Sequence, residues 1–278
     1  MMNALRHAFA AVLVAAALCS ATAPAHAGRN CEARLPDAST VLRAMDLAAR
    51  TAQALDATGA EVVVLARAGQ DLRKYGLRWS HLGLAYKETT DTGTRWRDGG
   101  KGAAVWRVVH KLNQCGSDTA DLYRQGLGEF FLDDLFDYQA AIVVPAPDVQ
   151  MRLQTLLQDN AAVRRLHTAA YNMLAYPWAP TYQQSNQWAI ETLAMAMEPG
   201  ANTRERAQAW LQFKGYEPTV LRLGAMTRLG ARLTAANIAF DDHPNDKRYS
   251  DHIETVTVDS VFSWLERAGL AGRVQVVR

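Results

Sequence analysis

The chain has 278 residues, 30 basic and 28 acidic side chains, and a hydrophobic content of 49%. That apolar content is enough for a sizeable core. Lysine and arginine are spread through the chain and the net charge is close to zero, which argues against nucleic acid or an anionic membrane surface as the main partner.

The N-terminus has the pattern of a secretory signal peptide. Arg6 supplies a basic head, residues 8–18 form an apolar run, and Ala25 and Ala27 make a cleavage site with small residues at −3 and −1. The run is too short to span a bilayer as a helix. The alternatives are a membrane anchor or an ordinary buried helix.

Cleavage at this site would remove residues 1–27 and leave residues 28–278, which we expect to form a single α+β domain. No later stretch approaches the length of a membrane span, so we expect no transmembrane segment after signal cleavage. The expected location of the mature protein is the periplasm or the medium.

Two cysteines, Cys31 and Cys115, remain after cleavage. An oxidising compartment favours a disulfide bond between them, and the alternative is two free thiols. Neither cysteine has the neighbours of a zinc site. The chain also lacks a nucleotide-binding glycine loop, so we expect no cofactor.

Periodicity and turn residues predict the secondary structure in chain order. A capped helix over 37–57 precedes strands over 61–66, 77–86 and 105–112, the last two forming an antiparallel hairpin with a long glycine-rich loop. A strand over 139–144 precedes helices over 148–158, 161–171, 185–197, 203–214 and 260–268, with short strands between 220 and 240. The predicted class is α+β, a mainly antiparallel sheet with packed helices.

Two histidines fall on the predicted hairpin. His81 shares a strand face with Gly83, which leaves room for a group to approach the imidazole, and His110 lies on the neighbouring strand. One imidazole could therefore orient the other. The alternative is a pair of ordinary histidines, one in the core and one at a solvated strand end.

Ser185 stands where the helix over 185–197 begins, and we expect it at the N-cap. Capping alone would explain a serine there. A nucleophile at a helix N-terminus that faces a histidine is also an arrangement for acyl transfer, in which His81 is the base and His110 fixes its tautomer.

Five segments of the chain resemble an uncharacterised family of exported bacterial proteins, the domain of unknown function family 2145. They are YGLRWSHLG at 75–83, GEFFLDD at 128–134, YNMLAYP at 171–177, QSNQW at 184–188 and FDDHP at 240–244. The resemblance covers nearly all of the mature chain and implies no established activity.

Three of these segments are also similar to circularly permuted papain-like (NlpC-type) hydrolases. Those enzymes have a Ser-His-x-Gly strand, a strand with a second polar residue, a Tyr-Asn segment and a cysteine that opens a helix. Here 80–83, His110 and Tyr171 with Asn172 take the first three places, and Ser185 takes the place of the cysteine. The resemblance implies a permuted papain-like core with either a serine nucleophile or a lost activity.

Aromatic side chains surround Ser185 in the sequence. Tyr171, Trp178, Tyr182 and Trp188, with Gln184, are candidates for binding a substrate in a groove. Equally, the aromatic residues could pack the loop against the sheet. The acidic segment around Asp241, Asp242 and His243 matches no metal-ligand spacing, and we predict no metal site.

Two functions remain open. The chain could be an amidase or esterase that acts on an envelope substrate through Ser185, His81 and His110. Alternatively, it could be a non-catalytic periplasmic protein that uses the same cleft to bind a ligand or a protein partner.

Overall fold

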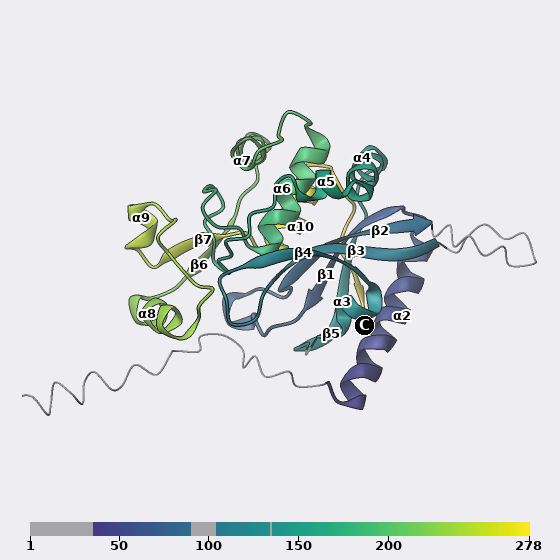
Figure 1. The fold of residues 1–278 in the computed structure, drawn as a ribbon, viewed down its shortest axis with the longest axis horizontal. Helices are drawn as coiled ribbons and strands as arrows, with labels where there is room; N and C mark the ends of the chain where they lie inside the picture. Colours follow the sequence, from purple (N-terminus) through teal and green to yellow (C-terminus); the bar gives the residue numbers. More distant parts are fainter. Residues whose placement is uncertain (1–35, 90–103, 134) are drawn as a thin grey trace, which may run out of the picture.

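The computed structural model describes residues 36–89, 104–133 and 135–278. Within them the main sheet has six strands in the order β4-β3-β2-β1-β5-β8, and all neighbours are antiparallel (Figure 1). The strands are β1 (Val62–Ala68), β2 (His81–Thr89), β3 (Ala104–Asn113), β4 (Ala120–Gly126), β5 (Asp137–Val143) and β8 (Gln275–Val277). The predicted α+β class with a mainly antiparallel sheet is confirmed.

One face of the sheet is covered by α2 (Ala38–Ala57) and α3 (Leu127–Phe131). The sequence offered Asp37 or Ser39 as the cap of α2, and the structure has Asp37, whose carboxylate accepts the Thr40 N–H. Leu47 and Leu55 of α2 belong to a buried cluster with Leu65 of β1 and Phe130 of α3. This layer supports the sheet from the side on which His81 and Gly83 lie.

The opposite face is covered by a second group of helices. They are α4 (Pro147–Gln158), α5 (Asn160–Arg164), α6 (Ser185–Met197), α7 (Arg204–Phe213) and α10 (Val258–Arg267). Helix α6 is buried from Ser185 to Ala196, so it runs through the interior rather than over the surface. Its Trp188 and Leu193 share the largest core cluster with Leu82 and Leu84 of β2.

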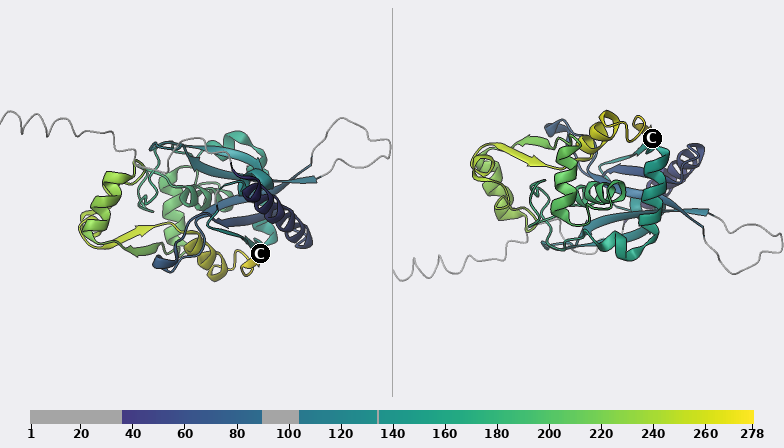
Figure 2. Two further views of the ribbon diagram at one scale, coloured as in Figure 1. Left: turned by 90° about the horizontal axis from the view of Figure 1, so that it is seen from below. Right: turned by 90° about the horizontal axis from the view of Figure 1, so that it is seen from above.

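A small second sheet projects from one end of the molecule (Figures 1 and 2). It pairs β6 (Thr219–Arg222) with β7 (His252–Thr255) and carries α8 (Ala225–Thr234) and α9 (Asn245–Arg248). We call these elements, residues 219–255, the β6–β7 lobe. The lobe has its own apolar cluster of Leu221, Leu223, Phe240 and Ile253.

Buried charges fix the long connection from 165 to 184. Arg204 of α7 forms an ion pair with Glu191 of α6, with 2.9 Å between Nε and Oε2, and both residues are buried. Gln183 and Gln208 also donate to the Glu191 carboxylate, at 2.6 and 2.8 Å. Arg204 donates in addition to the Pro180 and Tyr182 carbonyl oxygens, so the connection is attached to both helices.

Two predicted elements differ from the structure and one strand was missed. Of the short strands predicted over 220–240, β6 is present at the start, but helix α8 follows it. Apolar periodicity does not distinguish a helix from a strand reliably in so short a stretch. The helix predicted over 161–171 ends at Arg164. Strand β4 was missed since it is an edge strand with mostly polar, partly exposed residues.

Some predictions lie outside the described residues. They are the signal peptide over 1–27, the glycine-rich loop of the hairpin, and Cys31, so the disulfide bond from Cys31 to Cys115 stays a prediction. Among the described residues, no helix combines the length and the apolar character that crossing a membrane requires.

Candidate functional site

The first turn of α6 lies where two strands of the main sheet separate. Strand β2 pairs with β1 as far as His81, opposite Arg67, but its pairing with β3 stops at Leu84 and Val109. Beyond that point the Leu82 N–H donates to Asn186 Oδ1 at 3.0 Å. The side chain of Asn186 thus takes the place of a strand partner and holds the start of α6 beside His81.

Ser185 is the first residue of α6, and the N-cap is Gln184. Gln184 has extended backbone angles, and its side-chain oxygen accepts the Asn186 N–H at 3.2 Å. The amide group of Gln184 also donates to Thr255 Oγ1 at 3.0 Å. The expectation that Ser185 caps the helix is therefore wrong, and the cap does not account for the Ser185 hydroxyl.

The two histidines are in direct contact. His81 Nε2 and His110 Nδ1 are 2.9 Å apart, and His110 Nε2 is 2.7 Å from Gln125 Oε1 on β4. Because the Gln125 oxygen can only accept, His110 carries its proton on Nε2 and receives the His81 Nε2–H on Nδ1. This series of hydrogen bonds leaves the Nδ1 lone pair of His81 available.

Gly83 has a different role from the one that the sequence suggested. A Cβ atom at Gly83 would lie 2.5 Å from Val108 Cγ1, 3.2 Å from Phe130 Cε2 and 3.5 Å from His110 Cβ. The space over the glycine is thus filled by protein side chains. The missing side chain lets His110 and Phe130 approach, and the Phe130 ring contacts both imidazoles.

Both imidazoles are held neutral near pH 7. Burial, and then the nearby Arg67 guanidinium, lower the pKa of His110 to about 4. Burial, then Arg67 and then His110, lower the pKa of His81 well below its ordinary value. Arg67 is buried and pairs with Asp133, with 3.0 Å between Nη2 and Oδ2. A neutral His81 is the form that can accept a proton.

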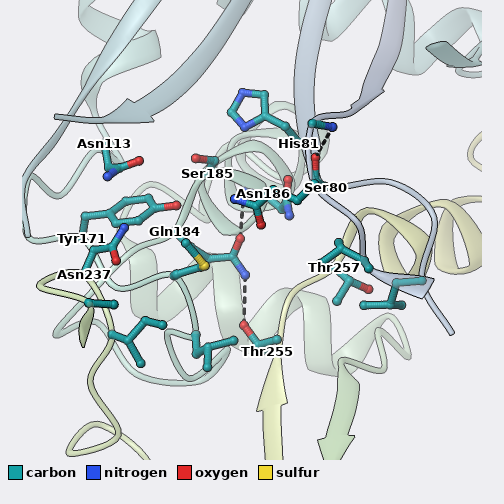
Figure 3. Close-up of a pocket in the computed structure, with 18 of the residues that line it drawn as sticks. Ser80, His81, Asn113, Tyr171, Gln184, Ser185, Asn186, Asn237, Thr255 and Thr257 are labelled. Atoms are coloured by element: carbon teal, nitrogen blue, oxygen red, sulfur yellow. Dashed lines mark hydrogen bonds between the residues drawn. The ribbon is translucent and has the colours of Figure 1, made fainter. Parts of the chain in front are cut away.

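Ser185 and His81 both line an open cavity of about 900 Å³ between the main sheet and the β6–β7 lobe. Figure 3 shows the His81 ring and the Ser185 side chain at the same end of this cavity, with the Tyr171 hydroxyl turned toward Ser185. Burial raises the pKa of Tyr171, and its interaction with Ser185 opposes that rise. In the described structure no hydrogen bond joins Ser185 directly to His81.

The predicted binding residues are divided between the cavity and the core. Tyr171 and Gln184 line the cavity, whereas Trp178, Tyr182 and Trp188 lie outside its lining. Trp188 is fully buried in the main core, and Trp178 packs against Tyr216. Tyr182 donates from its hydroxyl to Asp241 at 3.2 Å. For these three residues the structure matches the packing alternative.

The acidic segment at 241–243, within the lobe, attaches the lobe to the connection at Tyr176. His243 is buried between Asp242 Oδ1, 2.9 Å from Nδ1, and the Glu254 carbonyl oxygen, 3.0 Å from Nε2. Asp242 also accepts the Tyr176 N–H at 2.7 Å. In the described ranges no group of three or more histidine, cysteine, aspartate or glutamate side chains is arranged to hold a metal ion.

The sequence profile of a family described as an uncharacterised protein conserved in bacteria (DUF2145) matches residues 54–265. The chain belongs to this family. The family match spans His81, His110, Gln125 and Ser185, so the whole group of polar residues lies within the family's common region. No curated protein matches the chain, and no solved structure does. The papain-like resemblance therefore stays a prediction.

Sequence reasoning missed three residues of the site. Gln125 lies on the overlooked strand β4, and Arg67 reads as an isolated charge inside an apolar strand. Asn186 follows Ser185 directly and reads as an ordinary first-turn residue. Only Arg67 gave a usable signal, because a charged residue within a buried strand needs a partner.

Proposed function

We propose that this DUF2145 protein is an exported serine-dependent hydrolase that cleaves an ester or amide of the cell envelope. The observation that carries the proposal is the arrangement at one end of the cavity. A serine hydroxyl that is not needed for capping lies at the same end of the cavity as an imidazole (Figure 3), and that imidazole is oriented by a second one.

In the proposed reaction Ser185 Oγ attacks the substrate carbonyl carbon and His81 Nδ1 takes the hydroxyl proton. His81 then returns this proton to the leaving group as the bond from the carbonyl carbon to the leaving group breaks. Water, activated by the same His81, hydrolyses the acyl-enzyme and restores Ser185. His110 fixes the His81 tautomer through the 2.9 Å contact, and Gln125 fixes that of His110.

Two donors near Ser185 suit the oxyanion of such a reaction. The N–H of Ser185 belongs to the first turn of α6, where backbone N–H groups lack intrahelical acceptors and the helix dipole favours negative charge. The Tyr171 hydroxyl beside Ser185 is the second donor. Preorganised donors of this kind commonly provide the largest part of the stabilisation in acyl transfer.

The location and the substrate class rest on the sequence. The signal-peptide pattern at 1–27 supports export to the periplasm or the medium, where envelope amides and esters are the available substrates. The similarity of 80–83, His110 and 184–188 to permuted papain-like hydrolases supports the same reaction class. The separation of β2 from β3 at the start of α6 agrees with this reading.

A non-catalytic binding protein is the second candidate. It is favoured by the serine at a position where the similar hydrolases have cysteine, and by the lack of a direct bond from Ser185 to His81 in the described structure. Hydrogen bonds of this kind often tighten only when substrate binds, so the separation does not decide between the two functions.

Labelling with a fluorophosphonate probe tests the proposal. Wild type should be labelled at Ser185, while Ser185→Ala should not be labelled and His81→Ala should react at least 100-fold more slowly, in line with the usual contribution of a general base. Ser80→Ala is the matched control: Ser80 lines the same cavity, but its hydroxyl is bonded to the Arg67 carbonyl oxygen and to the Gly69 N–H. Equal labelling of all four proteins would refute the nucleophile and leave the binding function.

A further inference from the structure

The cavity has two unlike sides. The reactive groups lie on the sheet side, while the β6–β7 lobe and the segments facing it contribute mostly apolar side chains. These apolar lining residues are Tyr75, Leu77, Leu174, Leu221, Leu223, Ile238 and Phe240. Apolar walls with few polar groups are the usual lining of sites for small ligands, and about 900 Å³ is enough for a ligand of lipid or drug size.

Two cationic side chains line the cavity near its apolar side. Lys74 lies over Tyr75, with 4.7 Å between Nζ and the ring centroid, and Arg228 belongs to the lobe itself. Arg228 of α8 lines the cavity, its guanidinium lies 5.9 Å from the Phe240 ring centroid, and it donates from Nη1 to the Arg248 carbonyl oxygen. Its Nε is buried and has no hydrogen-bond partner among the described residues. Arg228 also forms no ion pair with a carboxylate of any described residue.

The carboxylates of the cavity are already engaged. Asp133 pairs with Arg67, Asp71 pairs with Arg73, and Glu129 accepts the Gly126 N–H. None of these groups needs a cation from a ligand, whereas Arg228 offers a donor and a positive charge next to a hydrocarbon surface. The charge pattern therefore matches a ligand that is anionic and apolar at once.

We propose that the cavity binds an anionic amphiphile, with its hydrocarbon chain on the apolar wall of the lobe and its carboxylate or phosphate group at Arg228. This inference deepens the proposed function, on which it rests for the idea that the ligand is a substrate or product. The amphiphile then supplies the acyl group or the apolar part of the ester or amide that Ser185 attacks. Binding itself does not depend on catalysis.

The test is fluorescence titration of the full mature chain carrying Ser185→Ala, so that no turnover occurs. The probe is 11-(dansylamino)undecanoic acid, and its methyl ester is the uncharged counterpart with the same chain. We expect saturable binding of the acid, and binding of the ester that is about tenfold weaker, as the loss of one charge-assisted hydrogen bond predicts. Equal affinity for acid and ester, or saturable binding of neither, would overturn the proposal.

Substitutions in the same background locate the two parts of the ligand. Arg228→Gln should weaken acid binding to the level of the ester and leave the ester unchanged, and Arg228→Lys should keep a preference for the acid. Leu223→Asn should weaken both probes by a similar factor, because it removes apolar wall and no charge. A preference for the acid that survives Arg228→Gln would contradict the assignment of the cation.

Competition distinguishes the two anionic groups. Dodecanoate and dodecyl phosphate are each titrated against the bound acid probe below their micelle concentrations. Displacement by dodecanoate indicates a free or released fatty acid, displacement by dodecyl phosphate indicates a phosphorylated lipid, and failure of both refutes an anionic amphiphile. Since labelling of Ser185 is measured separately, loss of the hydrolase proposal and loss of this one are distinguishable.

Discussion

At the scale of single residues, the site depends on how three side chains use their hydrogen-bonding atoms. His110 is fully buried and bonded at both nitrogens, so in the proposed function it is a positioning residue rather than a base. His81 retains one nitrogen for chemistry, and Ser185 retains its hydroxyl because Gln184 caps the helix. A change at Gln125 would therefore act on Ser185 through two imidazoles without touching a substrate.

The buried His110 should make stability depend on pH. Its folded-state pKa of about 4 lies below the ordinary value of 6.5, so the unfolded chain binds more protons between these values and stability falls as pH falls through that window. The contribution is complete above about pH 6.5 and amounts to about 3 kcal/mol for this residue.

Urea unfolding at pH 7.5 and 4.5 measures the effect. Between the two pH values the free energy of unfolding of wild type should fall by up to about 3 kcal/mol more than that of His110→Asn, because asparagine does not titrate. His167, whose pKa burial also lowers, titrates in both proteins and cancels in the comparison. The pKa of His81 is lowered in part by His110, so the difference between the two proteins reports the coupled imidazole pair. The same pH dependence in both proteins would show that His110 is not held neutral by the fold.

At the scale of elements, helix α6 links the site to the interior. Its first turn is fixed by the bonds of Asn186 and Gln184, and Glu191 in its middle is fixed by Arg204. Glu191 is completely buried, so its charge depends on the ion pair and on two amide donors. The position of Ser185 is therefore coupled to contacts well inside the molecule.

Removing one partner of the buried pair should destabilise the fold strongly. Arg204→Met leaves the Glu191 carboxylate without its cation and should lower the free energy of unfolding by about 3–5 kcal/mol. The double variant Glu191→Gln with Arg204→Met removes both charges. Its free energy of unfolding should therefore fall by clearly less than that of Arg204→Met alone. Chemical denaturation of the three proteins at pH 7 measures this, and a double variant less stable than Arg204→Met alone would argue against an uncompensated charge as the cause.

At the scale of the whole molecule, sequence patterns predicted most of the framework but not the relation between its parts. Helices α2, α6 and α7 and strands β1, β3 and β5 follow from caps and apolar periodicity, which are local signals. Strand β4 and helix α8 do not, because an edge strand and a small lobe are stabilised by contacts made at long range. The histidine pair was predictable from the hairpin. The roles of Gln125 and of Gln184 as the helix cap could be recognised only in the three-dimensional structure.

The proposed export gives a prediction for the N-terminal residues and the cysteines. Mass spectrometry of the protein recovered from the periplasm should find a mature N-terminus at Gly28 and a peptide in which Cys31 is joined to Cys115, because an exported chain with two cysteines meets an oxidising compartment. Protein kept in a reducing cytoplasm is the control and should contain both thiols. Two alkylatable thiols in the exported protein would refute the bridge.

The division of the cavity between two separately packed units has an evolutionary consequence. The imidazoles and the serine stand on the large sheet and its central helix, while the opposite wall stands on a miniature sheet with its own four-residue nucleus, Leu221, Leu223, Phe240 and Ile253. Natural variation can therefore change the lobe side of the cavity without moving the atoms that we propose to react. Among members of the family, we expect diversity to concentrate in residues 219–255 while the polar group at Ser185 drifts little.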